Sequence, residues 1–484
     1  MTENRIVAAA VGALALAWTA MAQAQTSAPP PEPAPETIAA PPPAPTLDEI
    51  LSRHLHLLTP QEPTPEGILA HEPTSRAAAP QLRRIVPGLA EAMEQLPPFL
   101  RDTAVRLHLR SFYFNRLNSD DTRNEAWAFG GWLAYKSGWL WDTFALGAVG
   151  YTSQPLYAPE DRGGTDLLHP TAGNPQDSIL VLGQAYAQLR YKEYALLTGY
   201  RQLVDEGYLN PHDSRMIPKT FEGVTMKGTI ERIGYNVGYL TAIKLREENK
   251  FHNMAEAAGV EGDKDRGLVL TRLSSEPVPG LSLYAANYLV PDVFNTAYGF
   301  AEYAHNLTSD LSFKIGLQAT DQRSVGAAFL GNFKTWNANT RGILIWRGLG
   351  VGAAFSATGE GSALQTPYGD PPGYFTFQEN NFDQARQKAW GLAARYDFGP
   401  GTLLPGAHIP GFSVLVRYAE GRDAINPSTG VGLPTVREGN LDVIWDVPGV
   451  PGLQFRFRNA YVAEGGHRVL PAFRIIMNYE LPLL

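Results

Sequence analysis

The stretch "RDTAVRLHLRSFYFNR", residues 101–116, decides the fold of this chain. Within it, the letters VRLHLR of residues 105–110 alternate apolar side chains with two arginines and a histidine. An alternation with a period of two is typical of a β-strand, because successive side chains point to opposite faces. One face of this strand is therefore apolar and the other is basic. A basic face needs water or anionic partners, so it cannot face a hydrophobic core.

The same alternating pattern continues from about residue 103 to the end of the chain. Segments of about 10 to 14 residues alternate apolar and polar side chains and are rich in Tyr, Phe, Trp, Val and Gly. We interpret 18 of them as strands. Their predicted ranges are 103–116, 125–137, 141–152, 179–192, 194–204, 219–229, 231–244, 266–275, 279–290, 294–305, 310–321, 333–346, 349–359, 387–399, 410–421, 437–447, 451–463 and 470–482.

One face of each predicted strand is nearly free of charge. In the segment 231–244 this face carries Tyr235, Val237, Tyr239 and Ile243. Aromatic residues tend to lie near the ends of the segments, as the interfacial girdles of a membrane barrel require. We therefore expect the uncharged face to contact lipid.

The connections alternate in length, which is a second regularity. Short turns such as "YKEY" and "VPGVPG" follow the even-numbered segments, and longer polar links such as 153–178, 205–218 and 360–386 follow most odd-numbered ones. This pattern predicts an all-β fold: a transmembrane, antiparallel, up-and-down β-barrel of about 18 strands with long extracellular loops and short periplasmic turns. A soluble propeller is the alternative, but no repeat of about 40 to 50 residues is visible.

Composition excludes several classes of protein. The 484 residues carry a net charge of −8 and contain no cysteine, so neither nucleic-acid binding nor disulfide or thiolate chemistry is indicated. His54 and His56 form the pattern H-x-H, but no third ligand lies near them. We expect no metal and no cofactor. After the N-terminus, no segment remains apolar long enough for a membrane helix.

The N-terminus is predicted to be organised in three parts that precede the barrel of residues 101–484. Residues 1–24 resemble a secretory signal peptide, with Arg5 in the basic region and the cleavage pattern Ala22-Gln23-Ala24 at its end. An N-terminal membrane anchor is the alternative. Residues 25–46 are a Pro/Ala-rich linker, and 47–100 form a periplasmic extension. Two short helices are possible here, the first over residues 46–58 and the second around residues 89–96.

The charges of the strands indicate which face lines the lumen. An Arg or Lys on the lipid face at mid-depth costs about 2 to 4 kcal/mol, so these side chains are assigned to the interior. Because the last strand of a closed barrel pairs with the first, cations from both ends of the sequence converge. The predicted pore-lining basic wall comprises Arg106, Arg110, Lys136, Arg395, Arg417, Arg456, Arg458 and Arg474.

Such a wall has two interpretations. Guanidinium groups bind carboxylates bidentately and keep their charge, so the wall could draw anionic solutes through a pore. The same arginines could instead stiffen the barrel by pairing with lumenal acids. The available acids are Asp397, Asp442, Asp446, Glu302 and Glu480.

Several motifs resemble the OprD-type family of outer-membrane porins. The strongest is "YRQLVDEGYLNPHDSRMIPKTFEGVTMKG", residues 200–228, with the runs Asp213-Ser214-Arg215 and Thr220-Phe221 and with Pro218 and Gly223. The segments "NEAWAFGGWLAYKSGWLWD", "SQPLYAPEDRGGTDLL" and "NKFHNMAEAAGVEGDKDRG" are also similar to that family. The resemblance extends from about residue 101 to the end, although the chain ends in Leu484 and not in a terminal aromatic residue.

The resemblance implies an 18-stranded porin whose third extracellular loop folds inward as a constriction. Here that loop is Asp205–Lys219, which we call the constriction loop. Its expected pore residues are Asp205, Glu206, Asp213, Ser214 and Arg215. By the same likeness, the three acids would oppose the basic wall and create a transverse field across the pore.

These features predict a passive porin in the bacterial outer membrane, selective for small carboxylate-bearing or other anionic solutes. The expected partners are those solutes, outer-membrane lipid and the barrel-assembly machinery, with no nucleic acid, and the protein would be a monomer or a trimer. A sugar or general-solute porin is the nearest alternative. An outer-membrane enzyme is less favoured, since no G-x-S-x-G nucleophile motif occurs, and a purely structural barrel is a further possibility.

Overall fold

The computed structural model describes residue 86 and residues 88–262, 264–399, 402–465 and 469–484. All of these residues belong to one compact unit, Leu47–Leu484. The predicted signal peptide, linker and first short helix therefore lie outside the described residues. Among the described residues, no helix is long and apolar enough to span a membrane.

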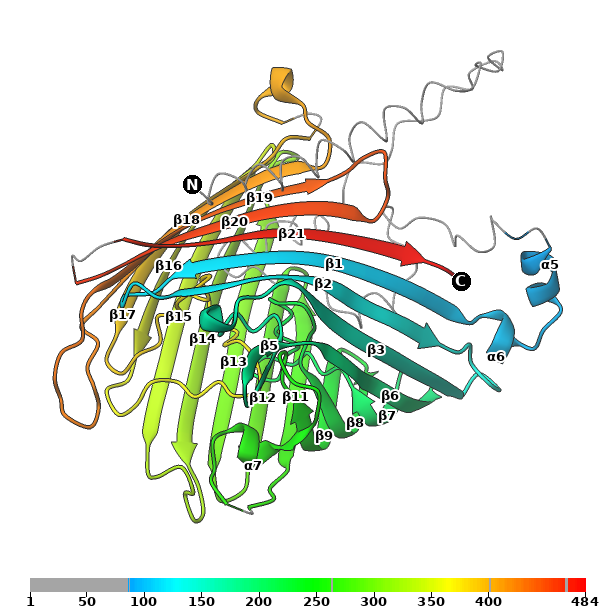
Figure 1. Cartoon of the computed structure of the whole chain (residues 1–484), viewed down its shortest axis with the longest axis horizontal. Coiled ribbons are helices and arrows are strands. Elements are labelled where there is room, and N and C mark those ends of the chain that lie inside the picture. The colour runs from blue at the N-terminus through cyan, green and yellow to red at the C-terminus, as the bar shows by residue number, and fades with distance from the viewer. Residues whose placement is uncertain (1–85, 87, 263, 400–401, 466–468) are drawn as a thin grey trace. The chain divides into compact units, whose positions relative to one another are not determined.

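Eighteen strands form a closed antiparallel ring, as the sequence predicts. Each strand pairs with its neighbours, and β1 pairs with both β2 and β21, so the first and last strands close the ring (Figure 1). The barrel strands are β1 (Ala104–Leu117), β2 (Arg123–Lys136), β3 (Phe144–Tyr157), β6 (Ile179–Tyr191), β7 (Ala195–Gln202), β8 (Thr220–Ile230), β9 (Ile233–Lys244), β11 (Leu268–Val278), β12 (Leu281–Val290), β13 (Phe294–Asn306), β14 (Leu311–Ser324), β15 (Lys334–Trp346), β16 (Leu349–Thr358), β17 (Lys388–Asp397), β18 (Phe412–Arg422), β19 (Val436–Asp446), β20 (Leu453–Glu464) and β21 (Leu470–Pro482).

Short elements lie outside the ring or extend it. The two-residue strand β10 (His252–Asn253) pairs with β9, while β4 (His169–Thr171) and β5 (Asn174–Asp177) form a small separate hairpin. The described helical elements are α5 (Leu89–Glu94), α6 (Pro98–Arg101), α7 (Met254–Ala257), η1 (Glu160–Arg162) and η2 (Pro405–Ala407). The second short helix expected near residues 89–96 is therefore present as α5.

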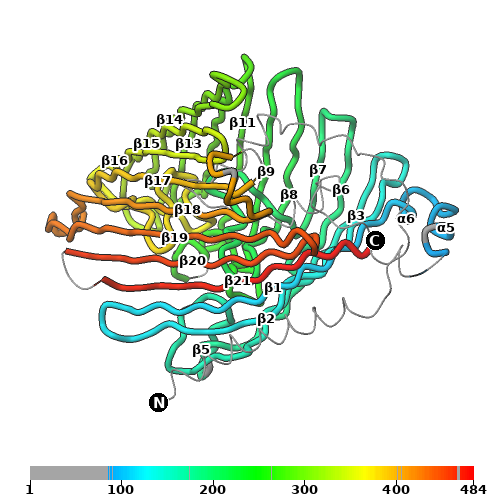
Figure 2. Tube along the Cα trace, turned by 90° about the horizontal axis from the view of Figure 1, so that it is seen from above, coloured from blue at the N-terminus to red at the C-terminus, as the bar shows by residue number. Residues whose placement is uncertain are grey.

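The strand connections alternate as expected. Turns at one end of the barrel can be as short as residues 231–232, whereas the other end carries the links 158–178, 203–219, 245–267, 359–387 and 423–435. The Cα trace in Figure 2 follows β18, β19, β20, β21 and β1 as successive neighbours around the ring. These five strands make up the side of the barrel on which the predicted cations converge.

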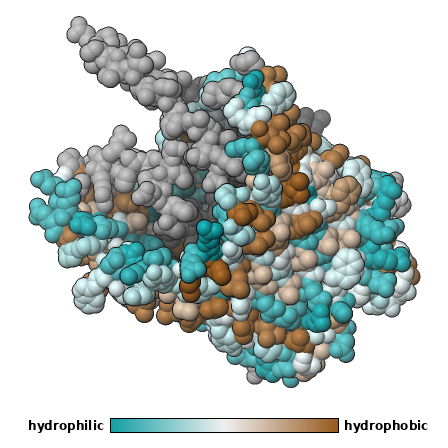
Figure 3. Space-filling model, turned by 180° about the vertical axis from the view of Figure 1, so that it is seen from behind, coloured by the Kyte–Doolittle hydropathy of each residue, from teal (hydrophilic) through white to brown (hydrophobic). Residues whose placement is uncertain are grey.

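The outer face of the strands is apolar. Side chains such as Leu133, Leu317 and Leu392 are exposed, as the predicted lipid face requires. In Figure 3, apolar residues gather over the wall of strands and hydrophilic residues gather toward the edges.

The prediction for Ile243 is wrong, because this side chain is fully buried inside the barrel. The residue opposite Gly223 is Leu240 and the residue opposite Glu222 is Ala242, so Thr241 is an extra residue in β9. A β-bulge of this kind changes which face the following side chains occupy.

Four loops fold into the barrel and pack against inward-facing side chains. Leu167 and Leu168 of the 158–178 link and Met216 and Ile217 of the constriction loop cluster with Phe112 of β1. Farther along the barrel, Tyr208 and Leu209 pack against β9 and β12 residues and against Met254 of the 245–267 link, and the 359–387 link contributes an aromatic cluster with β15 and β18. We expected inward folding only of the constriction loop, so the other three loops are additions from the structure.

Candidate functional site in the barrel lumen

Five of the predicted cations lie together on the lumenal side of β18, β20, β21 and β1. They are Arg417, Arg456, Arg458, Arg474 and Arg110, and all are buried within the barrel. Because Arg458 and Arg474 occupy directly opposite positions on β20 and β21, their proximity follows from the strand register. We call these five residues the arginine wall.

The other three predicted cations lie closer to the short-turn end. Arg106 is 3.6 Å from Glu480, and Arg395 is 2.9 Å from Asp397. The ammonium group of Lys136 lies 5.8 Å from the ring centre of Trp139. These three cations therefore flank the arginine wall and do not extend it across the barrel.

Strand carboxylates neutralise part of the arginine wall. Asp442 of β19 accepts hydrogen bonds from Arg456 at 2.8 and 2.5 Å and lies 3.2 Å from Arg458. Its side chain is 1% exposed, so this triad is shielded from water. A buried charge needs a partner of this kind because desolvation of an isolated ion is costly.

The constriction loop supplies a further carboxylate. The two oxygens of Asp213 accept hydrogen bonds from Arg110 at 2.7 and 3.1 Å, and the carbonyl of Arg215 accepts another. Arg215 donates to the carbonyl of Thr165 at 2.9 Å and lies over the ring of Phe114. Ser214 accepts a hydrogen bond from Arg246 at 2.7 Å. Asp213 therefore pairs with a member of the arginine wall.

The structure places Glu206 away from the arginine wall. Glu206 accepts hydrogen bonds from Arg272 at 2.8 Å and from Asn236 at 2.9 Å, which belong to β11 and β9. These strands are far from the arginine wall in the ring order. The buried Glu206 carboxylate is paired with the cation on the strand beside it, and Asp205 is exposed.

The 359–387 link, which we call the β16–β17 loop, lies directly on the arginine wall. Arg474 donates to the carbonyl of Gln378 at 2.9 Å and to Glu379 at 2.5 Å. Arg417 donates to the carbonyl of Thr376 at 3.1 Å and lies 4.5 Å from the ring centre of Phe377.

Glu438 of β19 also binds the β16–β17 loop, through the backbone of the loop. Its carboxylate accepts the backbone N–H groups of Gln378, Glu379 and Asn380 at 2.9, 3.1 and 2.9 Å. The contact of this loop with the arginine wall was not predicted from the sequence, although the run "GYFTF" at 373–377 was a signal. So many aromatic residues in a connection indicate packing and not solvation.

Four loops meet at a polar junction formed by Asp166, His212, Arg246 and Asp370. Arg246 donates to Asp166 at 2.7 Å and to Nε2 of His212 at 2.8 Å, and the same Nε2 lies 2.9 Å from Asp370. Burial, reinforced by the positive charge of Arg246, lowers the pKa of His212 to about 4. For Asp370, burial alone would raise the pKa, but His212 and Arg246 hold it below its usual value.

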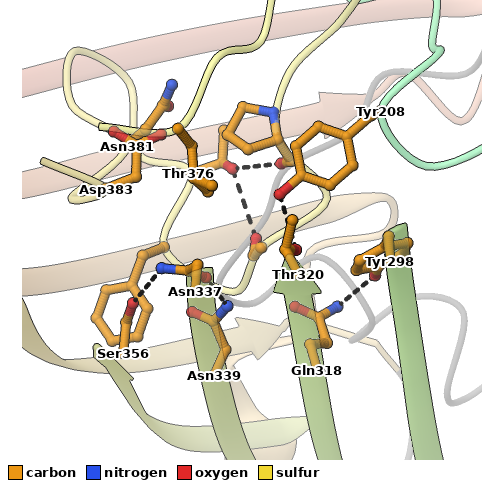
Figure 4. Close-up of a pocket in the computed structure, with 14 residues that line it drawn as sticks. Tyr208, Tyr298, Gln318, Thr320, Asn337, Asn339, Ser356, Thr376, Asn381 and Asp383 are labelled. Atoms are coloured by element: carbon orange, nitrogen blue, oxygen red, sulfur yellow. Dashed lines mark hydrogen bonds between the residues drawn. The ribbon is translucent and has the colours of Figure 1, made fainter. Parts of the chain in front are cut away.

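A pocket of largely uncharged polar groups lies on the lumenal side of β13 to β16 (Figure 4). The hydroxyls of Tyr208 and Thr320 are 2.9 Å apart, and Gln318 donates to Tyr298 at 3.0 Å. Further lining residues are Asn337, Asn339, Ser356, Thr376, Asn381 and Asp383. Burial raises the pKa of Asp383 to about 7.

The arrangement therefore combines a row of guanidinium groups with a pocket of hydroxyl and amide groups in one lumen. Among the described residues, no group of three or more His, Asp or Glu side chains is arranged to hold a metal ion. A closed ring of apolar-faced strands with a polar, charged lumen defines a channel protein of the outer-membrane barrel class.

The chain belongs to the OprD family of outer membrane porins, whose family model matches residues 97–483. Porin D of Pseudomonas aeruginosa is 25% identical over 430 residues, covering 80% of this chain and 92% of that protein. The protein is therefore an integral porin of the bacterial outer membrane.

Solved structures have the same fold. Pseudomonas aeruginosa OccK9 (OpdG) matches with a TM-score of 0.72 and 22% identity, over 80% of this chain and 100% of that one. Pseudomonas aeruginosa OpdK with vanillate matches with a TM-score of 0.71 and 22% identity, over 79% and 100% of the two chains. Acinetobacter baumannii OccAB2 matches with a TM-score of 0.72 and 20% identity, over 80% and 100%.

Proposed function

We propose that this porin conducts small carboxylate-bearing solutes passively along the arginine wall. The observation that carries the proposal is that loop carboxylates already bind this wall, Asp213 at Arg110 and Glu379 at Arg474. A solute carboxylate offers these guanidinium groups the same chemistry. Bidentate guanidinium–carboxylate pairing gives both affinity and orientation.

Transport requires that each binding step be reversible. A solute that reaches Arg474 competes with Glu379, and one that reaches Arg110 competes with Asp213. This competition weakens the net gain at every step, which lets the solute move to the next guanidinium. One solved relative, OpdK, is described with vanillate, a carboxylate, and the similarity of fold is compatible with a solute of this class.

A sugar or another neutral solute is the second candidate. The pocket of Figure 4 favours it, because hydroxyl and amide groups such as those of Tyr208, Gln318 and Asn337 can hydrogen-bond to uncharged polar groups. The arginine wall already binds two loop carboxylates, those of Asp213 and Glu379, so we place the carboxylate first.

Single-channel recording in planar bilayers tests the proposal with a panel of carboxylates, amino acids and neutral sugars. We expect carboxylates to interrupt the current at lower concentration than sugars of similar size. Replacing Arg456→Gln or Arg458→Gln should weaken this preference several-fold, because the triad with Asp442 loses a cation. Arg347→Gln is the control, since Arg347 pairs with Asp310 at the short-turn end. Unchanged carboxylate preference in both lumenal variants would contradict the role of the arginine wall. Equal block by sugars and carboxylates in the wild type would favour the neutral-solute function.

We further propose that residues 1–24 are removed as a signal peptide and that the rest of the N-terminal extension lies in the periplasm. Insertion by the barrel-assembly machinery is compatible with the final strand, β21, which retains Tyr479 and Leu481 near its end. A monomer and a trimer are both compatible with this proposal. Chemical cross-linking of the protein in native outer membranes would distinguish them.

A further inference from the structure

The outer face of the barrel carries the same four-residue arrangement twice. In the first copy, Arg323 and Lys334 are directly opposite each other on β14 and β15. Two residues farther from the loops, Asp321 is opposite Trp336 in the same register. These four side chains point away from the lumen, and Trp336 and Arg323 are about half exposed.

The second copy lies on β17 and β18. Here Lys388 is directly opposite Arg422, and Trp390 is directly opposite Glu420. Both copies therefore have the sequence pattern Lys-x-Trp on one strand and acid-x-Arg on its neighbour. We call each set of four residues a rim quartet, because the cations lie at the strand ends that adjoin the long loops.

Each rim quartet has more positive than negative charge. Asp321 pairs with Arg323 at 2.5 Å, and Glu420 pairs with Arg422, so the acid is already occupied by the arginine of its own strand. Arg437 on β19 also reaches Glu420, at 2.5 Å. The lysine is then the surplus cation of each copy.

The surplus lysines have weak partners within the protein. Lys388 is 71% exposed and lies 3.9 Å from Asp423, which is 59% exposed. Among the residues that the structure describes, the Lys334 ammonium group has no ion pair or hydrogen bond. Like charges directly opposite on neighbouring strands are destabilising, so each Lys/Arg pair favours an external anion between its members.

The position of the quartets identifies the kind of anion. Exposed tryptophans of outer-membrane barrels lie in the interfacial girdle, and the long loops are on the extracellular side. The lysine and arginine of a quartet lie two residues nearer to the long loops than the tryptophan. They are therefore at the level of the outer-leaflet headgroups, which their long side chains can reach. Carboxylate-bearing solutes in the lumen cannot reach these outward-facing groups.

We propose that each rim quartet binds a phosphate group on the headgroup of an outer-leaflet lipid. The Lys and Arg side chains donate charge-assisted hydrogen bonds to the phosphate oxygens. The Trp packs against the acyl–headgroup boundary, and the acid orients the Arg. The two copies give the barrel two lipid contacts on one side of the ring, near β14 to β18.

Native mass spectrometry of the detergent-solubilised protein with bisphosphorylated lipid A tests this proposal. In the double variant Lys334→Gln/Lys388→Gln each rim quartet loses one lysine. The affinity of each quartet for the lipid should therefore fall about fivefold. Lys192→Gln is the matched control, since Lys192 lies beside two aromatic rings, those of Tyr191 and Tyr194, but at the short-turn end. The control should bind like the wild type, and Lys334→Arg/Lys388→Arg should restore binding.

Two further experiments distinguish binding of the lipid from binding of phosphate alone. The same lipid without phosphates should bind the wild type as weakly as it binds the double variant. Inorganic phosphate at the same concentration should not displace the phosphorylated lipid. Equal binding by the double variant, equal binding of the dephosphorylated lipid, or displacement by inorganic phosphate would each overturn the proposal. Retained conductance of the double variant in planar bilayers establishes that its barrel is folded.

Discussion

Two arginines of the arginine wall, Arg456 and Arg458, pair with the same carboxylate, that of Asp442. Replacing Asp442→Asn leaves Arg456 and Arg458 buried without a carboxylate between them. Breaking a buried ion pair in this way costs about 3 to 5 kcal/mol, because the remaining charge is not solvated. We expect equilibrium urea unfolding, followed by tryptophan fluorescence, to show a loss of this size in the free energy of unfolding.

Asp397→Asn is the matched control for this prediction. Asp397 also pairs with an arginine, Arg395, but its side chain is 22% exposed, whereas that of Asp442 is 1% exposed. Water compensates more of the lost pairing there, so the cost should be about 1 kcal/mol or less. Equal losses in the two variants would contradict the shielding that we assign to Asp442.

At the same scale, His212 makes the loop junction sensitive to pH. Its Nε2 atom cannot accept from Arg246 and donate to Asp370 at the same time, so its charge state selects the partner. The pKa of His212 is about 4 in the folded protein and about 6.5 in an unfolded chain. Between these values the unfolded state binds the additional proton, so the stability from this residue is complete above pH 6.5 and is lost as the pH falls to 4.

Thermal unfolding between pH 7.5 and pH 4 measures this dependence. The wild-type melting temperature should fall with the pH, corresponding to at most about 3 kcal/mol at pH 4. His212→Gln should flatten the part of the curve between pH 6.5 and pH 4. His408→Gln, at an exposed position in the 398–411 link, should leave the curve unchanged. A wild-type curve that is flat over this range would refute the role of His212.

At the scale of elements, Glu438 fixes the β16–β17 loop on the arginine wall. Its carboxylate accepts three consecutive backbone N–H groups, and a glutamine amide would present N–H donors to some of them. Each buried donor left unsatisfied costs about 1 to 3 kcal/mol, so the loop should detach locally in Glu438→Gln. Single-channel recording should then show a larger and noisier current.

Glu464→Gln tests whether this effect is specific. Glu464 is an exposed residue at the end of β20 and accepts no loop backbone group among the described residues. Its replacement should leave the conductance at the wild-type value. A Glu438→Gln channel with wild-type conductance and noise would show that the loop does not limit the current.

The elements also show what the sequence could predict. The period of two located all 18 barrel strands, because a lipid face and a lumenal face impose opposite chemistry on alternate residues. Closure of the ring predicted that Arg110 and Arg474 lie near each other. The bulge at Thr241 has no such periodic signal, and it moved Ile243 to the interior.

The contacts of the loops were harder to predict from the sequence than the strands. The resemblance to the family predicted that Asp213 lies at the basic wall, but it did not predict the pairing of Glu206 with Arg272. Such a pairing joins residues far apart in the chain and depends on how each loop enters the barrel. Local patterns do not encode that path, and this also explains why the β16–β17 loop was missed.

At the scale of the whole molecule, all the strands that close the ring lie between Ala104 and Pro482. The backbone of Val105 also bonds to the end of the chain, since its carbonyl accepts the N–H groups of Leu483 and Leu484 at 2.7 and 3.1 Å. Residues just before the barrel also contact it: the Phe99 carbonyl accepts the N–H of Gly138 at 3.0 Å, and the Phe99 ring stacks on Phe144 with 6.5 Å between ring centres.

Deleting residues 25–96, while retaining the signal segment and the region from Pro97 onward, should therefore leave the barrel intact. The register from β1 to β21 and the contacts of Phe99 would be preserved, so we expect the closed ring to form as before. We expect the truncated protein to retain heat-modifiable migration on gels and wild-type single-channel conductance. A truncated protein that folds but conducts a different current would mean that the extension contributes to the pore. Failure to reach the outer membrane would mean that it contributes to assembly.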